Sequence, residues 1–192
     1  PSLTKMLQKP QAIVIAASTG GPQALATLFS SLGKMISDIP VFVVLHMPEQ
    51  FTPVVTAQIE RVSGRPTHAA QSGEIARPGN IYFAPGNKHL ILKGNCLSVA
   101  THLDDGDAIN FCKPAADKLF ESAVPIYGSR LIAIVLSGMG SDGCKGAAKI
   151  ANASGIVIAQ DQATSAAWGM PAAVRDAGIA NHILPIELIA GH

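Results

Sequence analysis

Three uninterrupted apolar runs set the main constraint on how this chain can fold. Ala12–Ala17, Val41–Leu45 and Leu131–Leu136 are short and rich in β-branched residues. Strands buried on both faces of a sheet have this pattern, whereas half-exposed strands alternate apolar and polar residues. A short polar or glycine-rich segment and then a stretch of helical character follow each run. Strands that alternate with helices predict a mostly parallel sheet with helices on both sides.

The remaining segments supply further elements of both kinds. Helices are predicted over 23–32, 52–62, 114–124 and 144–153, with an interrupted helix over 165–177. Further strands are predicted over 81–84, 89–93, 96–101, 156–159 and 182–184. Thr52 is the predicted cap of its helix, and Gly94-Asn95 predicts a two-residue hairpin turn. The expected fold is a doubly wound α/β domain, with an antiparallel hairpin at one edge of a mostly parallel sheet.

Length and composition describe one ordered domain. The chain has 192 residues, of which 48% are hydrophobic and 14% charged, so we expect a large core and no disorder. The first ten residues have no regular pattern. We therefore predict an irregular leader or linker remnant over 1–10 and a single domain over 11–192.

Charge and cysteine content exclude several classes of function. The net charge is +1 and no block of Lys or Arg occurs, so we expect no nucleic-acid partner. The three cysteines are far apart and lack zinc-site spacing, which predicts no metal and fits a reducing compartment. The longest apolar runs are too short to span a bilayer, and no signal peptide is visible. These features predict a cytoplasmic protein without membrane insertion.

Ser18, His46 and Asp142 each lie just beyond the end of a predicted buried strand. Ligands of open α/β sheets bind outside these carboxyl ends, so the three side chains can meet if their strands are neighbours. They are the types needed for a nucleophile, a general base and a carboxylate that orients the base. Backbone N–H groups near Gly20 and Gly140 can form an oxyanion hole. Because Gly-x-Ser-x-Gly is absent, an ordinary α/β-hydrolase is disfavoured.

Other interpretations of the same residues stay open at this point. Ser18 or Thr19 can cap the helix after the first strand, and Asp142 can cap the helix that begins near Gly143. His46 can be a core histidine whose hydrogen bonds are satisfied. The glycines after Ser18 can also cradle a phosphate at a helix N-terminus, although GxGxxG and the P-loop lysine are missing.

Six segments, in order along nearly the whole chain, resemble the catalytic domain of the chemotaxis protein-glutamate methylesterase family. Each alone is weakly specific, but their combination is highly specific. The segments are Ala17-Ser-Thr-Gly-Gly-Pro22, His46-Met-Pro48 with Phe51-Thr52, Ala84-Pro-Gly-Asn-Lys-His89, Ser137-Gly-Met-Gly-Ser-Asp-Gly143, Ile158-Ala-Gln160 and Trp168-Gly-Met-Pro171.

The resemblance implies a reaction and a role for each matching residue. Ser18 matches the nucleophile, His46 the general base and Asp142 the orienting carboxylate. The N–H of Met139 matches an oxyanion-hole donor. Residues expected to bind the oxyanion or substrate are thus Met139, Thr19, Gly20, Gly140 and Met170. The implied reaction is hydrolysis of glutamate methyl esters on the cytoplasmic domain of a chemoreceptor, with release of methanol and no cofactor, by a single methylesterase catalytic domain over 11–192.

Two further activities fit the same resemblance. Some members deamidate glutamine through the same triad, because both reactions are acyl transfers. A module that binds a receptor without catalysis is a third alternative, in which the triad residues are only caps. Family members usually carry a phosphorylatable receiver domain, which is expected as a partner that this sequence does not include.

One segment departs from the pattern of the family. Family members usually read Asn-Arg-x-Arg-Pro-Ser-x-Asp where this chain has Asn110-Phe-Cys-Lys-Pro-Ala-Ala-Asp117. Phe111 and Lys113 replace the arginines, and Ala115 replaces the serine. Lysine cannot reproduce the bidentate grip of arginine on a carboxylate. Lys113 is nevertheless the residue of this segment that we expect to contact the receptor.

Overall fold

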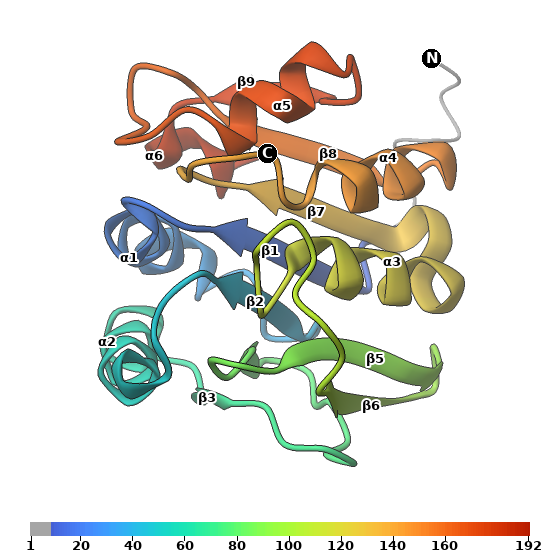
Figure 1. The fold of residues 1–192 in the computed structure, drawn as a ribbon. Helices are drawn as coiled ribbons and strands as arrows, with labels where there is room; N and C mark the ends of the chain where they lie inside the picture. The colour runs from blue at the N-terminus through green and yellow to red at the C-terminus, as the bar shows by residue number, and fades with distance from the viewer. Residues whose placement is uncertain (1–8) are drawn as a thin grey trace.

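A seven-stranded sheet forms the centre of the computed structural model, which describes residues 9–192 (Figure 1). The strand order is β3-β4-β2-β1-β7-β8-β9, and every neighbouring pair is parallel. Its strands are β1 Ala12–Ala17, β2 Val41–Leu45, β3 Thr67–Ala69, β4 Ile81–Phe83, β7 Leu131–Val135, β8 Ile156–Gln160 and β9 His182–Leu184. The predicted leader over 1–10 lies outside the described residues, except for Lys9 and Pro10.

Helices cover both faces of this sheet, as the doubly wound prediction requires (Figure 1). One face carries α1 Gly21–Leu32, α2 Thr52–Ser63 and α6 Ile186–Ile189. The other carries α3 Ala116–Tyr127, α4 Cys144–Asn152 and α5 Met170–Asp176. Short 3₁₀ turns, η2 Glu49–Phe51 and η3 Gly128–Arg130, precede α2 and β7. No helix within residues 9–192 is long and apolar enough to cross a bilayer.

The unbroken apolar run of β1 follows from its position between these two layers. Ala12, Val14 and Ala16 pack into one core cluster, while alternate residues such as Ile13 and Ile15 pack into the other. Because side chains alternate across a strand, a strand covered on both faces needs apolar residues at every position. Complete burial of a side chain such as Ile15 is worth roughly 1.5–3 kcal/mol.

The predicted hairpin is present, but its turn is two residues later than predicted. β5 His89–Asn95 pairs antiparallel with β6 Ser98–Asp104, and Cys96 and Leu97 form the turn. The side-chain oxygen of Asn95 accepts hydrogen bonds from the N–H groups of Leu97 (3.0 Å) and Ser98 (3.3 Å). Asn95 therefore fixes the loop from its start and does not lie inside it. The hairpin is a separate two-stranded sheet on the α3 side of the main sheet (Figure 1).

Three local predictions differ from the structure. The helix α2 has Thr52 as its first residue and not as its cap, because η2 leads directly into it; the Thr52 hydroxyl is buried without a partner. The interrupted helix over 165–177 is helical only from Met170 onwards. The strand β3 and the helix α6 were not predicted, since segments of three and four residues carry little periodicity.

The strand order places a topological switch point at β1. From β1 the chain goes first to β2 on one side and returns later to β7 on the other. Neighbouring loops therefore diverge at the carboxyl ends of β1 and β7, and this opening is where doubly wound sheets bind ligands.

Candidate active site

The first two predicted catalytic residues follow adjacent parallel strands in matched register. Ala17 at the end of β1 pairs with Leu45 at the end of β2, so Ser18 and His46 each lie one residue beyond this pair. The His46 N–H donates to the carbonyl of Ala17 at 3.0 Å. On the other side, the Ser18 N–H donates to the carbonyl of Ser137 after β7, at 2.9 Å. These backbone bonds hold Ser18 between the loops that follow β2 and β7.

The third predicted residue, Asp142, binds His46 directly. His46 Nε2 lies 2.7 Å from Asp142 Oδ2, and the exposed fractions of the two side chains are 17% and 2%. The same carboxylate accepts the first N–H groups of α3, from Ala116 at 2.6 Å and from Asp117 at 3.0 Å. The sequence allowed Asp142 to cap the helix near Gly143, which is α4. In the structure its carboxylate instead caps α3, and the same carboxylate orients His46.

These contacts keep Asp142 ionised. Burial alone would raise its pKa, but hydrogen bonds from His46, Ala116 and Asp117 outweigh burial, and the net pKa is lower than the usual value of 3.8. An ionised Asp142 accepts a hydrogen bond from the N–H at Nε2, which leaves the lone pair of a neutral imidazole on Nδ1. Nδ1 is therefore the nitrogen of His46 that can act as a base.

Ser18 lies beside this base without a hydrogen bond to it in this structure. Within residues 9–192, the side-chain partners of His46 are Asp142 at Nε2 and Cys112 at Nδ1, the latter at 3.9 Å. Catalytic hydrogen bonds are often long before substrate binds. The alternative in which Ser18 or Thr19 caps α1 is not observed, because Gly20 is the N-cap and no side chain caps the helix.

Free backbone donors surround Ser18, as an oxyanion hole requires. The N–H groups of Thr19, Gly20 and Met139 have no hydrogen-bond partner among the described residues. Gly138 lets the β7–α4 loop approach closely, since a Cβ there would lie 2.8 Å from the Ser18 Cβ. Unpaired N–H groups on two loops can therefore converge on an oxygen next to Ser18.

The other two residues predicted to bind substrate differ in their surroundings. Gly140 has a φ of +82° and open space where a Cβ would lie, so its backbone is accessible from solvent. Met170 is completely buried in the core. Its sulfur lies beneath Gly138, where an added Cβ would be 2.3 Å away. In this structure Met170 supports the loop from below, and the role predicted for it in substrate binding stays a prediction.

The segment that departs from the family pattern lies against the site. Lys113 does not extend freely into solvent, because its ammonium group binds the Asp105 carboxylate at 2.8 Å and is held within the chain. Cys112, which the sequence reasoning did not single out, contacts His46. Burial, together with the charges of Asp142 and Asp117, raises the pKa of the Cys112 thiol. Cys112 is therefore a neutral neighbour of the base and a poor nucleophile.

His46, Cys112 and Asp142 also form a cluster of metal-ligand types, with one donor atom of each within 4.8 Å of the others. Both oxygens of Asp142 already accept hydrogen bonds. Apart from Asp142, the cluster offers two ligand atoms, His46 Nδ1 and the Cys112 sulfur, which contact each other at 3.9 Å. Zinc sites in proteins use three or four protein ligands. These three side chains therefore fit a hydrogen-bond network better than a metal centre.

Ser137 and Gln160 hold the loops of the site together, and the sequence reasoning missed both. The Ser137 hydroxyl donates to the carbonyl of Thr19 at 2.7 Å and accepts the N–H of Ala167 at 3.0 Å. The Gln160 side chain accepts the Ser137 N–H at 2.8 Å. Both are about 1% exposed. The sequence did contain a signal for them, because both lie at the carboxyl ends of predicted strands, the position that selected Ser18 and His46.

Asp117 lies beneath the site, and only one of its two carboxylate oxygens has a hydrogen-bond partner among the described residues. One carboxylate oxygen accepts the N–H of Gly146 in α4 at 2.7 Å, while the other is buried without a partner. Burial raises the pKa of Asp117, and the nearby charge of Asp142 adds to this. Ionised Asp117 is therefore destabilising, and this cost grows as pH rises through its folded-state pKa.

We expect Asp117→Asn to raise the free energy of unfolding at pH 7, because the amide keeps the oxygen that accepts from Gly146 and removes the buried charge. The gain over wild type should shrink towards acid pH, where Asp117 is protonated in both the folded and the unfolded state. Urea denaturation at several pH values measures this. A stability loss that is equal at all pH values would contradict the assignment of a raised pKa.

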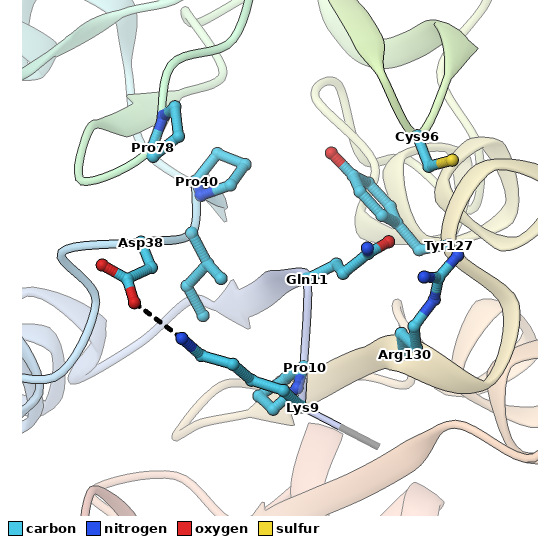
Figure 2. A pocket seen from close by; sticks show the side chains of 10 residues that line it. Lys9, Pro10, Gln11, Asp38, Pro40, Pro78, Cys96, Tyr127 and Arg130 are labelled. Carbon is cyan, nitrogen blue, oxygen red and sulfur yellow. Dashed lines mark hydrogen bonds and ion pairs between the residues drawn. The ribbon is translucent and has the colours of Figure 1, made fainter.

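One cavity lies at the opposite end of the sheet (Figure 2). Its volume is about 590 Å³, and residues that line it immediately precede strands: Gln11 precedes β1, Pro40 precedes β2 and Arg130 precedes β7. A second cavity of about 470 Å³ lies at the carboxyl end and is lined by Gly20, Ser137 and others. Size alone would select the first, but the residues capable of acyl transfer are all at the carboxyl end, where ligands of such sheets bind.

Comparisons with known proteins agree with this geometry. The family model for the CheB methylesterase domain matches residues 13–192. A protein of Nitrobacter hamburgensis named protein-glutamate methylesterase/protein-glutamine glutaminase is 46% identical over 181 residues, which are 94% of this chain and 48% of that protein. One of Caulobacter vibrioides with the same type of name is 43% identical, over 93% of this chain and 52% of that protein.

A solved structure is similar over its whole length. The catalytic domain of the Thermotoga maritima CheB methylesterase has a TM-score of 0.91 and 39% identity, covering 96% of this chain and 97% of that chain. The present chain spans about half the length of the curated relatives it matches. With most of the chain matched by the family model, and with the same fold in a solved member, this chain belongs to the CheB methylesterase family.

Proposed function

We propose that this chain is a serine esterase that hydrolyses methyl esters of glutamate side chains on chemoreceptors and releases methanol. The observation that carries the proposal is the 2.7 Å contact of Asp142 with His46 at the strand end that adjoins Ser18. The names of the relatives support the substrate class. The methylated cytoplasmic domain of a receptor is the proposed partner, in the cytoplasm, and a receiver domain is the proposed regulatory partner.

The proposed mechanism uses the free nitrogen of His46 twice. Nδ1 removes the proton of the Ser18 hydroxyl while Oγ attacks the ester carbonyl carbon, and Asp142 stabilises the imidazolium. Backbone N–H groups, with Met139 foremost, hold the oxyanion. The C–O bond to the methoxy group then breaks, and methanol leaves with the proton from Nδ1. Water that is activated by Nδ1 hydrolyses the acyl-enzyme and restores Ser18.

Glutamine deamidation is a second candidate activity of the same site. The relatives carry a double name that includes protein-glutamine glutaminase. An amide can follow the same steps, with ammonia leaving in place of methanol. Measurement of ammonia from unmethylated receptor and of methanol from methylated receptor separates the two reactions.

A fluorophosphonate probe tests whether the site is catalytic at all. We expect the probe to modify Ser18 in the folded protein, because only a serine activated by a neighbouring base reacts readily. Peptide mass spectrometry locates the label, and Ser30, an exposed serine of α1, is the internal control. Labelling of Ser30 as fast as Ser18, or of neither, would favour a module that binds without catalysis.

A further inference from the structure

A tight turn before α3 has an unusual backbone. Ile109 and Cys112 exchange two backbone hydrogen bonds, of 3.0 and 2.8 Å, and enclose Asn110 and Phe111. Both enclosed residues have positive φ, +48° for Asn110 and +67° for Phe111. Turns with positive φ at both central positions favour Gly, Asn or Asp. Asn110 therefore fits this turn, whereas Phe111 is strained in it.

Among residues 9–192, the Phe111 side chain buries no surface that would offset this strain. Phe111 is completely exposed, at 103% of the reference area. A bulky residue at positive φ is a genuine outlier, and backbone strain of this kind concentrates at functional sites. Strain and full exposure together indicate a side chain that is placed for an external contact.

The position of Phe111 identifies what it can contact. Its neighbour Cys112 has its sulfur 3.9 Å from His46 Nδ1, so the residue that closes the turn contacts the base. On the opposite loop, Met139 is 68% exposed and follows Gly138, which packs against Ser18. Two exposed apolar side chains thus lie on the two loops that contact the base and the nucleophile. Aromatic side chains at such positions often carry much of the binding energy between proteins.

We propose that Phe111, with Met139, binds an apolar side chain of the protein substrate next to the methylated glutamate and selects protein substrates over small esters. This inference rests on the proposed function. Released methanol is too small for recognition, so binding energy must come from groups of the substrate away from the reacting ester. Phe111 is consequently a specificity residue and takes no part in the chemical step.

Three variants test the assignment with two substrates. Phe111→Ser should raise KM for methylated receptor about tenfold, as expected if Phe111 is one of the few contact residues that carry most of the binding energy. It should leave hydrolysis of p-nitrophenyl acetate unchanged. Phe111→Leu, which keeps an apolar side chain, should restore most of the receptor KM. Leu97→Ser is the matched control, since Leu97 is 94% exposed at the β5–β6 turn. This control should change neither the receptor KM nor the hydrolysis of p-nitrophenyl acetate.

A stability measurement distinguishes recognition from a structural role. Phe111→Gly should raise Tm, because glycine adopts positive φ without strain, while receptor KM still rises. A lowered Tm would mean that Phe111 supports the fold, and a receptor KM equal to wild type in Phe111→Ser would overturn the proposal. If wild type hydrolyses the small ester but never demethylates receptor, the proposed function fails instead, and the two failures are distinguishable.

Discussion

Replacement of Ser18 by alanine is expected to lower kcat on methylated receptor by about 10⁴-fold or more, because the reaction loses its nucleophile. Binding of the receptor should change little, since Ser18 makes no other side-chain contact that the mechanism needs. The fold should also persist, because backbone bonds hold this position: the Ser18 N–H donates to the carbonyl of Ser137, and the Ser18 carbonyl accepts the N–H of Gly21. Methanol release under saturating receptor measures kcat directly.

Ser30→Ala is the matched control for this variant. Ser30 is an exposed serine in α1, the helix that follows Ser18, and within the described part of the chain its hydroxyl donates to the carbonyl of Thr27. It should retain wild-type kcat. Ser18→Ala with wild-type turnover would remove Ser18 from the mechanism, whereas an equal loss in both variants would indicate misfolding and not chemistry.

Replacement of Asp142 by alanine is expected to damage both activity and stability. Loss of the carboxylate that orients a catalytic histidine lowers kcat by about 10⁴-fold. The same change leaves the N–H groups of Ala116 and Asp117 and the His46 ring N–H without their acceptor. Each buried donor left unpaired costs about 1–3 kcal/mol. Two of these donors, the N–H groups of Ala116 and Asp117, are buried, so the free energy of unfolding should fall by about 2–6 kcal/mol.

The stability effect of Asp142 should depend on pH in a defined direction. Its folded-state pKa lies below the usual value of 3.8. The ionised group therefore contributes stability that is fully present above 3.8 and is lost as pH falls through the lower, folded-state pKa. Urea denaturation of wild type and variant should show the difference at pH 7 and a smaller difference in strong acid.

Two further variants keep this prediction testable if Asp142→Ala does not fold. Asp142→Asn retains one acceptor oxygen, so it should fold better but stay inactive, because the amide cannot stabilise the imidazolium. Asp176→Asn is the control, since Asp176 is an exposed acid paired with Arg175, and such pairs contribute at most about 1 kcal/mol. A stable and active Asp142→Asn protein would contradict the role of Asp142.

The parts of the fold that depend on local pattern were predictable from the sequence. β1, β2 and β7 are buried on both faces, so their apolar runs have no polar interruptions, and their bounds were predicted within one residue. The rule that ligands bind at carboxyl strand ends then selected Ser18 and His46. Their adjacency required the strand order, and no spacing along the chain encodes that β1 lies between β2 and β7.

Contacts between distant segments were not predictable. Asp142 caps α3, whose first residues precede it by 26 and 25 positions, and Cys112 reaches His46 across 66 positions. The predicted position of the hairpin turn was wrong for a local reason. Gly94-Asn95 is a typical turn pair, but the Asn95 side chain accepts hydrogen bonds from the N–H groups of Leu97 and Ser98, and the turn lies at the two residues after Asn95. Side-chain bonds of this kind do not appear in a hydrophobic pattern.

The most direct test of the central claim is methanol release from receptor that carries methylated glutamates, with the new carboxylates counted in the same sample. We predict that the wild-type chain releases methanol catalytically and forms one glutamate carboxylate for each methanol. No methanol from a folded, fluorophosphonate-reactive protein would contradict the account and leave deamidation as the remaining reaction, with ammonia as its product.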